Sequence, residues 1–138
     1  MIKARKKILV VDDDPVMVRF SERLLHMDGY AVATALNGKT GLTKAKEERP
    51  DLILLDVLMP DMSGVELAKR LTTDPETQDI PIVFMTITIP LDEDHGNQKI
   101  DINGRHCQAF AKPNHRQKLL SVIRKAINRK VNHNQDAS

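Results

Sequence analysis

The sequence contains very little cysteine and few aromatic residues: one cysteine, no tryptophan and one tyrosine in 138 residues. Because Cys107 stands alone, an internal disulfide and a cysteine-rich metal site are excluded, and a free thiol suits a reducing compartment. The apolar runs are much shorter than the roughly 20 residues of a membrane-spanning helix, and the N-terminus lacks the apolar stretch of a signal peptide. We therefore expect a cytoplasmic protein without membrane contact.

Charge of one sign is not in large excess either, since 21 Lys and Arg residues oppose 19 Asp and Glu residues. This balance gives no electrostatic reason to expect nucleic acid as a partner, and no DNA-binding module is recognisable. Basic residues without acidic ones do gather in residues 112–130, as a solvated helix face or a docking surface for an acidic partner. The length suits one domain, which we expect over residues 1–130, followed by a flexible polar tail over residues 131–138.

Two short apolar runs lead directly into acidic residues. Residues 8–11 precede Asp12 and Asp13, and residues 52–55 precede Asp56. Unbroken apolar runs of this length are typical of strands that are buried on both faces of a parallel sheet. Because ligands bind at the carboxyl ends of strands in open α/β sheets, the two acidic groups are the first candidates for a functional site.

Strand-like and helix-like segments alternate along the rest of the chain. Further strands are predicted over residues 31–35, 82–86 and 109–111. Helices are predicted from about residue 15, where Met17, Phe20, Leu24 and Met27 recur at helical spacing, over about residues 38–48 and 64–73, and around residues 119–127. This alternation predicts an α/β fold with a parallel sheet and helices on both of its faces.

Residues 88–108 depart from this alternation. A proline and a glycine in this segment disfavour a helix, and the Asn103-Gly104 pair between two short alternating runs is a strong hairpin signal. We therefore predict that a β-hairpin or loop replaces the fourth helix and leads into the strand over residues 109–111. A distorted helix with a long loop is the alternative.

Four segments together resemble the receiver domain of two-component response regulators. They are residues 7–15 and 51–64, which contain the acidic groups, and residues 81–86 and 111–113. The resemblance extends over about residues 5–128, and the four motifs in this order make it specific. It implies a stand-alone receiver with a flavodoxin-like, doubly wound fold and a five-stranded parallel sheet in the order 2-1-3-4-5.

The resemblance implies a phosphoryl-accepting site. Asp56 would be the nucleophile that takes a phosphoryl group from a phosphohistidine, with Lys112 as a point charge on one phosphoryl oxygen and Thr86 as a hydroxyl donor to another. In the family, movement of that hydroxyl switches a protein-docking surface. We expect no enzymatic turnover beyond self-catalysed phosphoryl acceptance and slow self-dephosphorylation, because the apolar side chain of Leu58 cannot orient an attacking water.

Transfer of a phosphoryl group to a carboxylate requires that the repulsion between two anions be cancelled. The usual remedy is Mg²⁺, held by carboxylates, waters and phosphate oxygens. The resemblance implies that Asp13, Asp56 and the backbone carbonyl of Leu58 bind Mg²⁺ directly. Asp12 would act mainly through a bound water.

The expected partners are a histidine kinase or histidine phosphotransfer protein and an unknown downstream protein, with the chain as a monomer or weak homodimer. Two other functions stay open. Ile87 stands where receivers usually carry a small residue and Ala109 where they usually carry a switching aromatic, so a degenerate receiver could be a phosphorylation-independent binding module. Alternatively, Asp12 and Asp14 resemble the nucleophile–acid pair of a haloacid dehalogenase-type phosphatase.

Overall fold

The computed structural model describes residues 5–86, 98–111 and 116–136. Its strands are β1 (Lys7–Val11), β2 (Ala31–Ala35), β3 (Leu52–Asp56), β4 (Ile82–Thr86), β5 (Gln98–Ile102) and β6 (Arg105–Ala111). Its helices are α1 (Pro15–Met27), α2 (Gly38–Glu48), α3 (Gly64–Thr73) and α4 (Arg116–Asp136). Helix α4 therefore continues through most of the segment predicted as a polar tail.

The strands form one six-stranded sheet in the order β2-β1-β3-β4-β6-β5. The first five strands in this order are parallel, and β5 pairs with β6 in the antiparallel direction. The predicted parallel sheet is thus confirmed, with β6 as its fifth parallel strand. The sheet gains an antiparallel edge strand, and the last parallel strand begins at Arg105, four residues before the predicted position 109.

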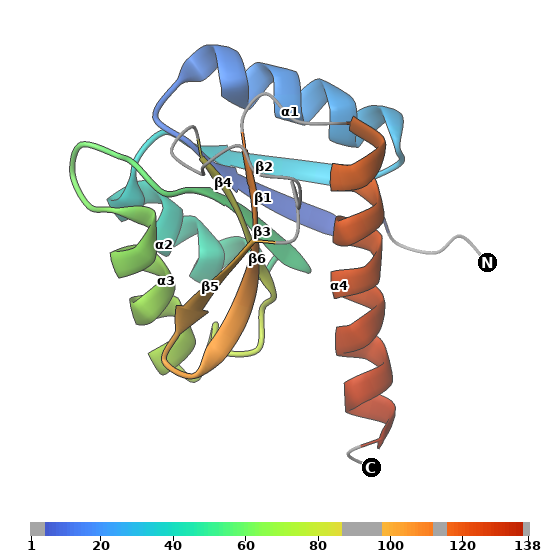
Figure 1. The fold of residues 1–138 in the computed structure, drawn as a ribbon. Helices are drawn as coiled ribbons and strands as arrows, with labels where there is room; N and C mark the ends of the chain where they lie inside the picture. Colours follow the sequence, from blue (N-terminus) through green and yellow to red (C-terminus); the bar gives the residue numbers. More distant parts are fainter. Residues whose placement is uncertain (1–4, 87–97, 112–115, 137–138) are drawn as a thin grey trace.

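Helices cover both faces of the sheet, with α1 and α4 on one side and α2 and α3 on the other (Figure 1). Successive residues of the central strands point to opposite faces. In β1, Ile8 and Val10 pack with α1 and α4, while Leu9 and Val11 pack with α2 and α3. All residues of β3 are buried, which explains why its sequence is an unbroken apolar run.

Helix α1 packs on the sheet with a face that matches only in part the one its spacing indicated: Leu24 and Met17 contact the core, but Phe20 and Met27 do not lie in it. The buried residues include Val18, Leu24 and Leu25, whereas 46% of Phe20 and 72% of Met27 are exposed. The expected apolar stripe was therefore wrong in part. The helix begins where predicted, because the Asp14 side chain accepts a hydrogen bond from the Val16 amide and Pro15 occupies the first turn.

The predicted hairpin is confirmed over residues 98–111. Its two-residue turn consists of Asn103 and Gly104, whose φ angles of 52° and 87° are both in the left-handed region. Asparagine and glycine tolerate this region best, which is why the pair marks tight hairpins. The first part of the segment in question, residues 88–97, lies outside the described residues.

The hairpin is attached to the segment between α3 and β4. The Arg105 guanidinium donates hydrogen bonds to the carbonyls of Gln78 (2.7 Å) and Ile80 (3.1 Å). The Asn103 side-chain amide donates to Thr72 Oγ1 at 3.1 Å. These bonds hold the hairpin turn against the end of α3.

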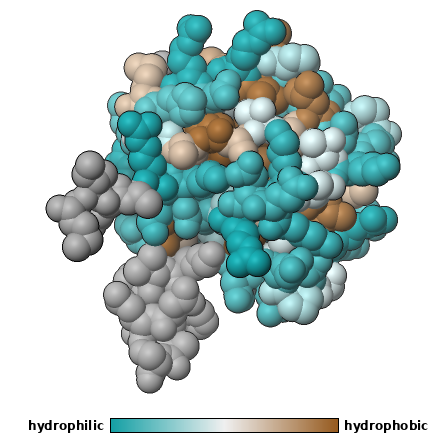
Figure 2. All heavy atoms as spheres, turned by 180° about the vertical axis from the view of Figure 1, so that it is seen from behind, coloured by the Kyte–Doolittle hydropathy of each residue, from teal (hydrophilic) through white to brown (hydrophobic). Residues whose placement is uncertain are grey.

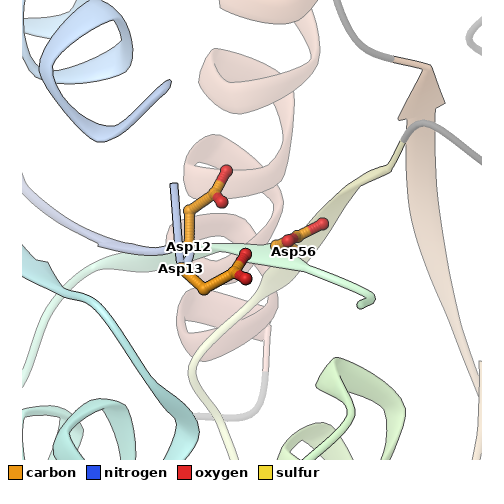
Figure 3. A group of neighbouring side chains, drawn as sticks. All are labelled: Asp12, Asp13 and Asp56. Atoms are coloured by element: carbon orange, nitrogen blue, oxygen red, sulfur yellow. The ribbon is translucent and has the colours of Figure 1, made fainter. Parts of the chain in front are cut away.

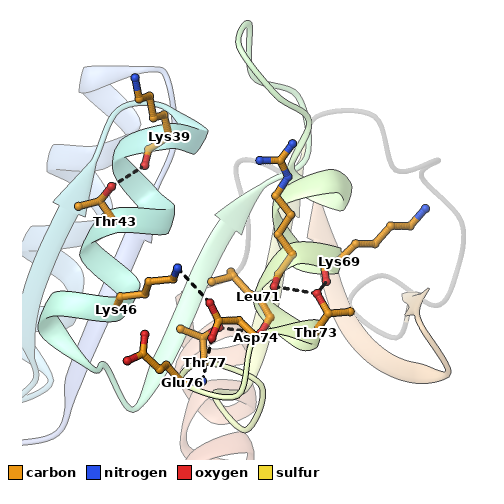
Figure 4. Close-up of polar contacts among 10 residues, drawn as sticks. Lys39, Thr43, Lys46, Lys69, Leu71, Thr73, Asp74, Glu76 and Thr77 are labelled. Carbon is orange, nitrogen blue, oxygen red and sulfur yellow. Dashed lines mark hydrogen bonds and ion pairs between the residues drawn. The ribbon is translucent and has the colours of Figure 1, made fainter.

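That acceptor segment is itself ordered by local polar contacts (Figure 4). The Thr77 hydroxyl donates to the Leu71 carbonyl at 2.7 Å inside the protein, and the Asp74 carboxylate accepts from the Glu76 amide. Lys46 of α2 forms an ion pair with Asp74 at 3.0 Å. The segment that accepts the hydrogen bonds of the hairpin is therefore itself held in place by hydrogen bonds and an ion pair.

The surface opposite to the view of Figure 1 is mostly hydrophilic, with hydrophobic side chains in small separate patches (Figure 2). Within the described part of the chain, no helix combines the length and the apolar character needed to cross a membrane. The two large apolar clusters instead lie between the sheet and its helices.

We predict that Arg105→Ala loosens the hairpin. Loss of two hydrogen bonds from a charged donor should lower the free energy of unfolding by about 1–3 kcal/mol and speed amide hydrogen exchange in β5 and β6. Exchange measured by mass spectrometry checks this, with Arg129→Ala on the exposed side of α4 as control. Unchanged exchange in β5 would contradict the anchoring role.

Candidate functional site

Three carboxylates meet at the carboxyl ends of two neighbouring strands (Figure 3). Because β1 and β3 are parallel, with Val11 beside Leu55, the residues that directly follow Val11 and Leu55 lie at the same edge of the sheet. One carboxylate oxygen from each of Asp12, Asp13 and Asp56 lies within 4.8 Å of the other two. The structure thus brings together the acidic residues that the sequence singled out.

The three carboxylates differ in their access to solvent. Asp12 and Asp56 are each only 6% exposed, whereas Asp13 is exposed. Asp12 Oδ1 accepts a hydrogen bond from the Asp14 amide at 3.0 Å, and the Asp12 amide donates to the Ala35 carbonyl. The cluster therefore has a buried, fixed side and an open side at Asp13.

This donor set fits a hard divalent cation. Carboxylate oxygens are the ligands that Mg²⁺ prefers, and Mg²⁺ usually keeps several waters alongside one or two protein carboxylates. Like charges at this separation repel one another, and a cation between them relieves that repulsion. Because Asp13 is exposed, solvent can supply the waters that Mg²⁺ retains.

The loop after β3 is held close to Asp56 by a glycine. A Cβ atom at Gly64 would overlap the carbonyl oxygen of Asp56, and the Gly64 amide donates to the Val57 carbonyl at 2.7 Å. The steric role of Gly64 depends on how α3 meets the end of β3, which no local sequence pattern reveals.

The same loop is tied to α2 by Asp61, a residue that sequence reasoning missed. The Asp61 carboxylate accepts hydrogen bonds from the amides of Gly38 and Lys39, both at 3.0 Å. These bonds hold the pKa of Asp61 below its usual range, and the carboxylate sits at the positive end of the α2 dipole. The sequence shows only an aspartate in a loop; that this loop lies against the start of α2 is visible only in the structure.

The structure places the backbone of Thr86 near this edge. Asp56 pairs with Met85 of β4, so Thr86 follows at the same end of the sheet, and Thr86 in turn pairs with Ala111 of β6. Ala111 directly precedes Lys112 in the sequence. Lys112 and the side chain of Thr86 lie outside what the structure describes.

The structure describes the surroundings of Ala109 and Leu58. Ala109 is fully buried in the apolar cluster under α2 and α3 and pairs with Phe84, so this position holds no aromatic side chain that could move. Leu58, two residues after Asp56, is 51% exposed beside the acidic cluster. Ile87 lies outside the described residues.

A family model described as "Response regulator receiver domain" matches residues 8–124. Over 80 residues, or 58% of the chain, the sequence is 46% identical to the response regulator PleD of Caulobacter vibrioides and 38% identical to the protein PilH of Pseudomonas aeruginosa. The matched stretch covers 18% of PleD and 66% of PilH.

Solved structures share the fold. The chemotaxis protein CheY4 of Vibrio cholerae superposes with a TM-score of 0.75 and 27% identity, covering 89% of this chain and 99% of that one. A CheY-like receiver domain from Methanospirillum hungatei superposes with a TM-score of 0.76 over 94% of this chain and 99% of that one. At 24% identity, the second match concerns the fold alone.

We predict opposite effects of Asp13→Asn with and without Mg²⁺. Without a divalent cation, removal of one charge should raise the free energy of unfolding by on the order of 1 kcal/mol. With Mg²⁺, the unmodified protein should gain stability through binding and the variant should gain much less. Denaturant unfolding followed by circular dichroism measures both, with Asp79→Asn as control; an equal Mg²⁺ response would exclude Asp13 as a ligand.

Proposed function

Because the chain belongs to the receiver-domain family of two-component response regulators, we propose that Asp56 accepts a phosphoryl group from a phosphohistidine in a Mg²⁺-dependent step. The observation that carries this proposal is the approach of three carboxylates within 4.8 Å at the ends of β1 and β3. A lone aspartate at a strand end is commonly a helix cap, as Asp14 is here. Asp56 is the last residue of a fully buried strand, and the helix after it, α3, is capped by Ser63.

The proposed chemistry is nucleophilic substitution at phosphorus. An oxygen of the Asp56 carboxylate forms a bond to phosphorus as the phosphorus–nitrogen bond of the donor breaks. The bonding electron pair stays on the imidazole nitrogen, and the product is an acyl phosphate on Asp56. The chain acts as an acceptor and not as an enzyme with turnover.

Asp13, Asp56 and the backbone carbonyl of Leu58 would bind Mg²⁺ directly, with Asp12 acting through a water. When bound, the ion neutralises charge on the phosphoryl oxygens and the carboxylates. Asp12 is fixed by its hydrogen bond from the Asp14 amide, and the carbonyl of Asp56 is packed against Gly64. These contacts fix the Asp12 carboxylate and the backbone of Asp56 before the phosphoryl donor arrives.

Lys112 and Thr86 would recognise the phosphoryl group after transfer. The Lys112 ammonium acts as a point charge, and the Thr86 hydroxyl donates a hydrogen bond. Support comes from the pairing of Thr86 with Ala111, the residue before Lys112, at the same sheet edge as Asp56. Movement of Thr86 toward the phosphate then shifts the population of a protein-docking surface.

A protein donor suits the surroundings of the acidic cluster. Val16 and Phe20 of α1 and Leu58 after β3 are exposed apolar side chains on segments that begin directly beyond the three carboxylates. Apolar side chains form the core of many protein interfaces, so these three side chains suit contact with a protein donor. The proposed donor is a histidine kinase or phosphotransfer protein, the output is an unidentified downstream protein, and both meetings take place in the cytoplasm.

We predict that incubation with acetyl phosphate and Mg²⁺ adds the mass of one phosphoryl group to the intact protein. The adduct should be absent from Asp56→Asn and in the presence of a chelator. Asp79→Asn, which alters an exposed carboxylate far along the chain from the cluster, should be modified like the unaltered protein. Intact-protein mass spectrometry detects the adduct in each of these samples.

Two further measurements, added to this experiment, separate the alternative functions. No adduct, together with no spectral response to beryllofluoride, would contradict phosphoryl acceptance and favour a phosphorylation-independent binding module. Turnover of a phosphomonoester that depends on Asp12 would favour the haloacid dehalogenase chemistry. Against the latter, Asp14 is engaged as the cap of α1.

We predict that the phosphorylated protein loses its phosphoryl group slowly, over many minutes. The exposed apolar side chain of Leu58 offers no group that orients water, and a positioned general base contributes roughly 10²–10⁴-fold. Leu58→Asn, which supplies a polar group without full base strength, should accelerate the loss by about tenfold. Mass spectrometry after removal of acetyl phosphate gives the rates, and a lifetime of seconds for the unaltered protein would contradict the prediction.

A further inference from the structure

Strand β5 ends the sheet on one side. It pairs with β6 and with no other described strand. An edge strand presents a row of backbone amide and carbonyl groups that can pair with another strand. The hairpin register identifies which of these groups face outward.

In a hairpin with a two-residue turn, the residues that flank the turn form a hydrogen-bonded pair, and such pairs then alternate along the strands. Ile102 pairs with Arg105 across the turn, and Ile100 pairs with Cys107. The backbone groups of these β5 residues therefore point toward β6. The amides and carbonyls of Lys99 and Asp101 point away from β6, toward the side on which no other described strand pairs with β5. We call this side the free edge.

The side chains of β5 divide between two faces. Ile102 is buried and Ile100 half-buried in the apolar cluster under α2 and α3. Lys99 and Asp101 lie on the opposite face, and both are exposed. The free edge thus carries one positive and one negative side chain, two residues apart on the same face.

We propose that β5 pairs with β5 of a second copy of this chain in the antiparallel direction. The two-fold axis that relates the copies passes between their two Ile100 residues. In this register Lys99 of each copy lies opposite Asp101 of the other, and the outward backbone groups of both residues form hydrogen-bonded pairs. The two copies of Ile100 meet on the apolar face. The two sheets join into one continuous sheet.

Charge distinguishes this arrangement from a protected edge. Charged side chains, especially lysine, commonly protect an edge strand from pairing with another strand. Here the two-fold axis places opposite charges across the new strand pair twice, and opposite-charge cross-strand pairs are stabilising. The edge is therefore complementary to itself, which favours a second copy over an unrelated strand.

The edge also needs little reorganisation before it pairs. Arg105 and Asn103 fix the turn end of the hairpin to the α3–β4 segment, and Ile102 is packed in the core. A pre-ordered surface loses less entropy on association. Because each copy contributes only five residues of strand, the dimer is weak and depends on concentration. It does not depend on phosphorylation of Asp56.

Sedimentation velocity over a concentration series tests the pairing through charge exchange. Lys99→Asp and Asp101→Lys, made singly, should each raise the dimer dissociation constant by about tenfold or more, because each places like charges opposite one another. The double variant with both exchanges should restore dimerisation. Lys125→Asp on the exposed side of α4 should leave it unchanged, and thermal unfolding of every variant checks that the fold is retained.

Cysteine crosslinking tests the register independently. Residues on the two-fold axis form a non-hydrogen-bonded pair with Cα atoms about 4.5 Å apart, within disulfide range. Ile100→Cys in a Cys107→Ser background should therefore form a disulfide-linked dimer under mild oxidation, and Lys99→Cys in that background should not. A monomer at every concentration, or no rescue in the double charge exchange, would overturn the proposal.

Discussion

The parallel pairing of β1 with β3 is the contact on which the rest of the molecule depends. It aligns Val11 with Leu55, so that the acidic residues that follow these two positions meet at one sheet edge. Apolar residues on both faces of these strands stabilise the pairing, because helices cover both sides. The burial that makes the sheet stable also fixes Asp12 and Asp56 where charge is costly.

The unfavourable burial of negative charge at Asp12 and Asp56 favours the binding of a cation at this site. A cation that binds the folded protein but not the unfolded chain stabilises the fold and relieves repulsion between the carboxylates. The loop after β3 is shaped around the same point, since Gly64 admits the helix backbone next to Asp56 and Asp61 ties the loop to α2. Position and charge are thus set by a few contacts at one edge of the sheet.

The sequence predicted those features that depend on local patterns. The acidic strand ends follow from apolar runs next to aspartates, and the hairpin follows from Asn103 and Gly104, whose backbone angles few other residues adopt easily. Features that depend on tertiary packing were missed. The buried face of α1, the early start of β6 at Arg105 and the close approach at Gly64 are decided by neighbouring elements.

The hairpin adds β5 to the sheet as an antiparallel edge strand. A self-complementary sheet edge stands there, and a small buried residue, Ala109, occupies the position of the usual aromatic. The acidic site and the β5 edge are therefore separable features of one sheet. Any communication between them would pass through β4 and β6, which join them directly.

The most direct test of the central claim is an anomalous difference map from crystals grown with Mn²⁺, which prefers the same oxygen ligands as Mg²⁺. The account predicts one strong peak between the carboxylates of Asp13 and Asp56 and the carbonyl of Leu58. An empty cluster, with Mn²⁺ bound at other carboxylates, would contradict the proposed site.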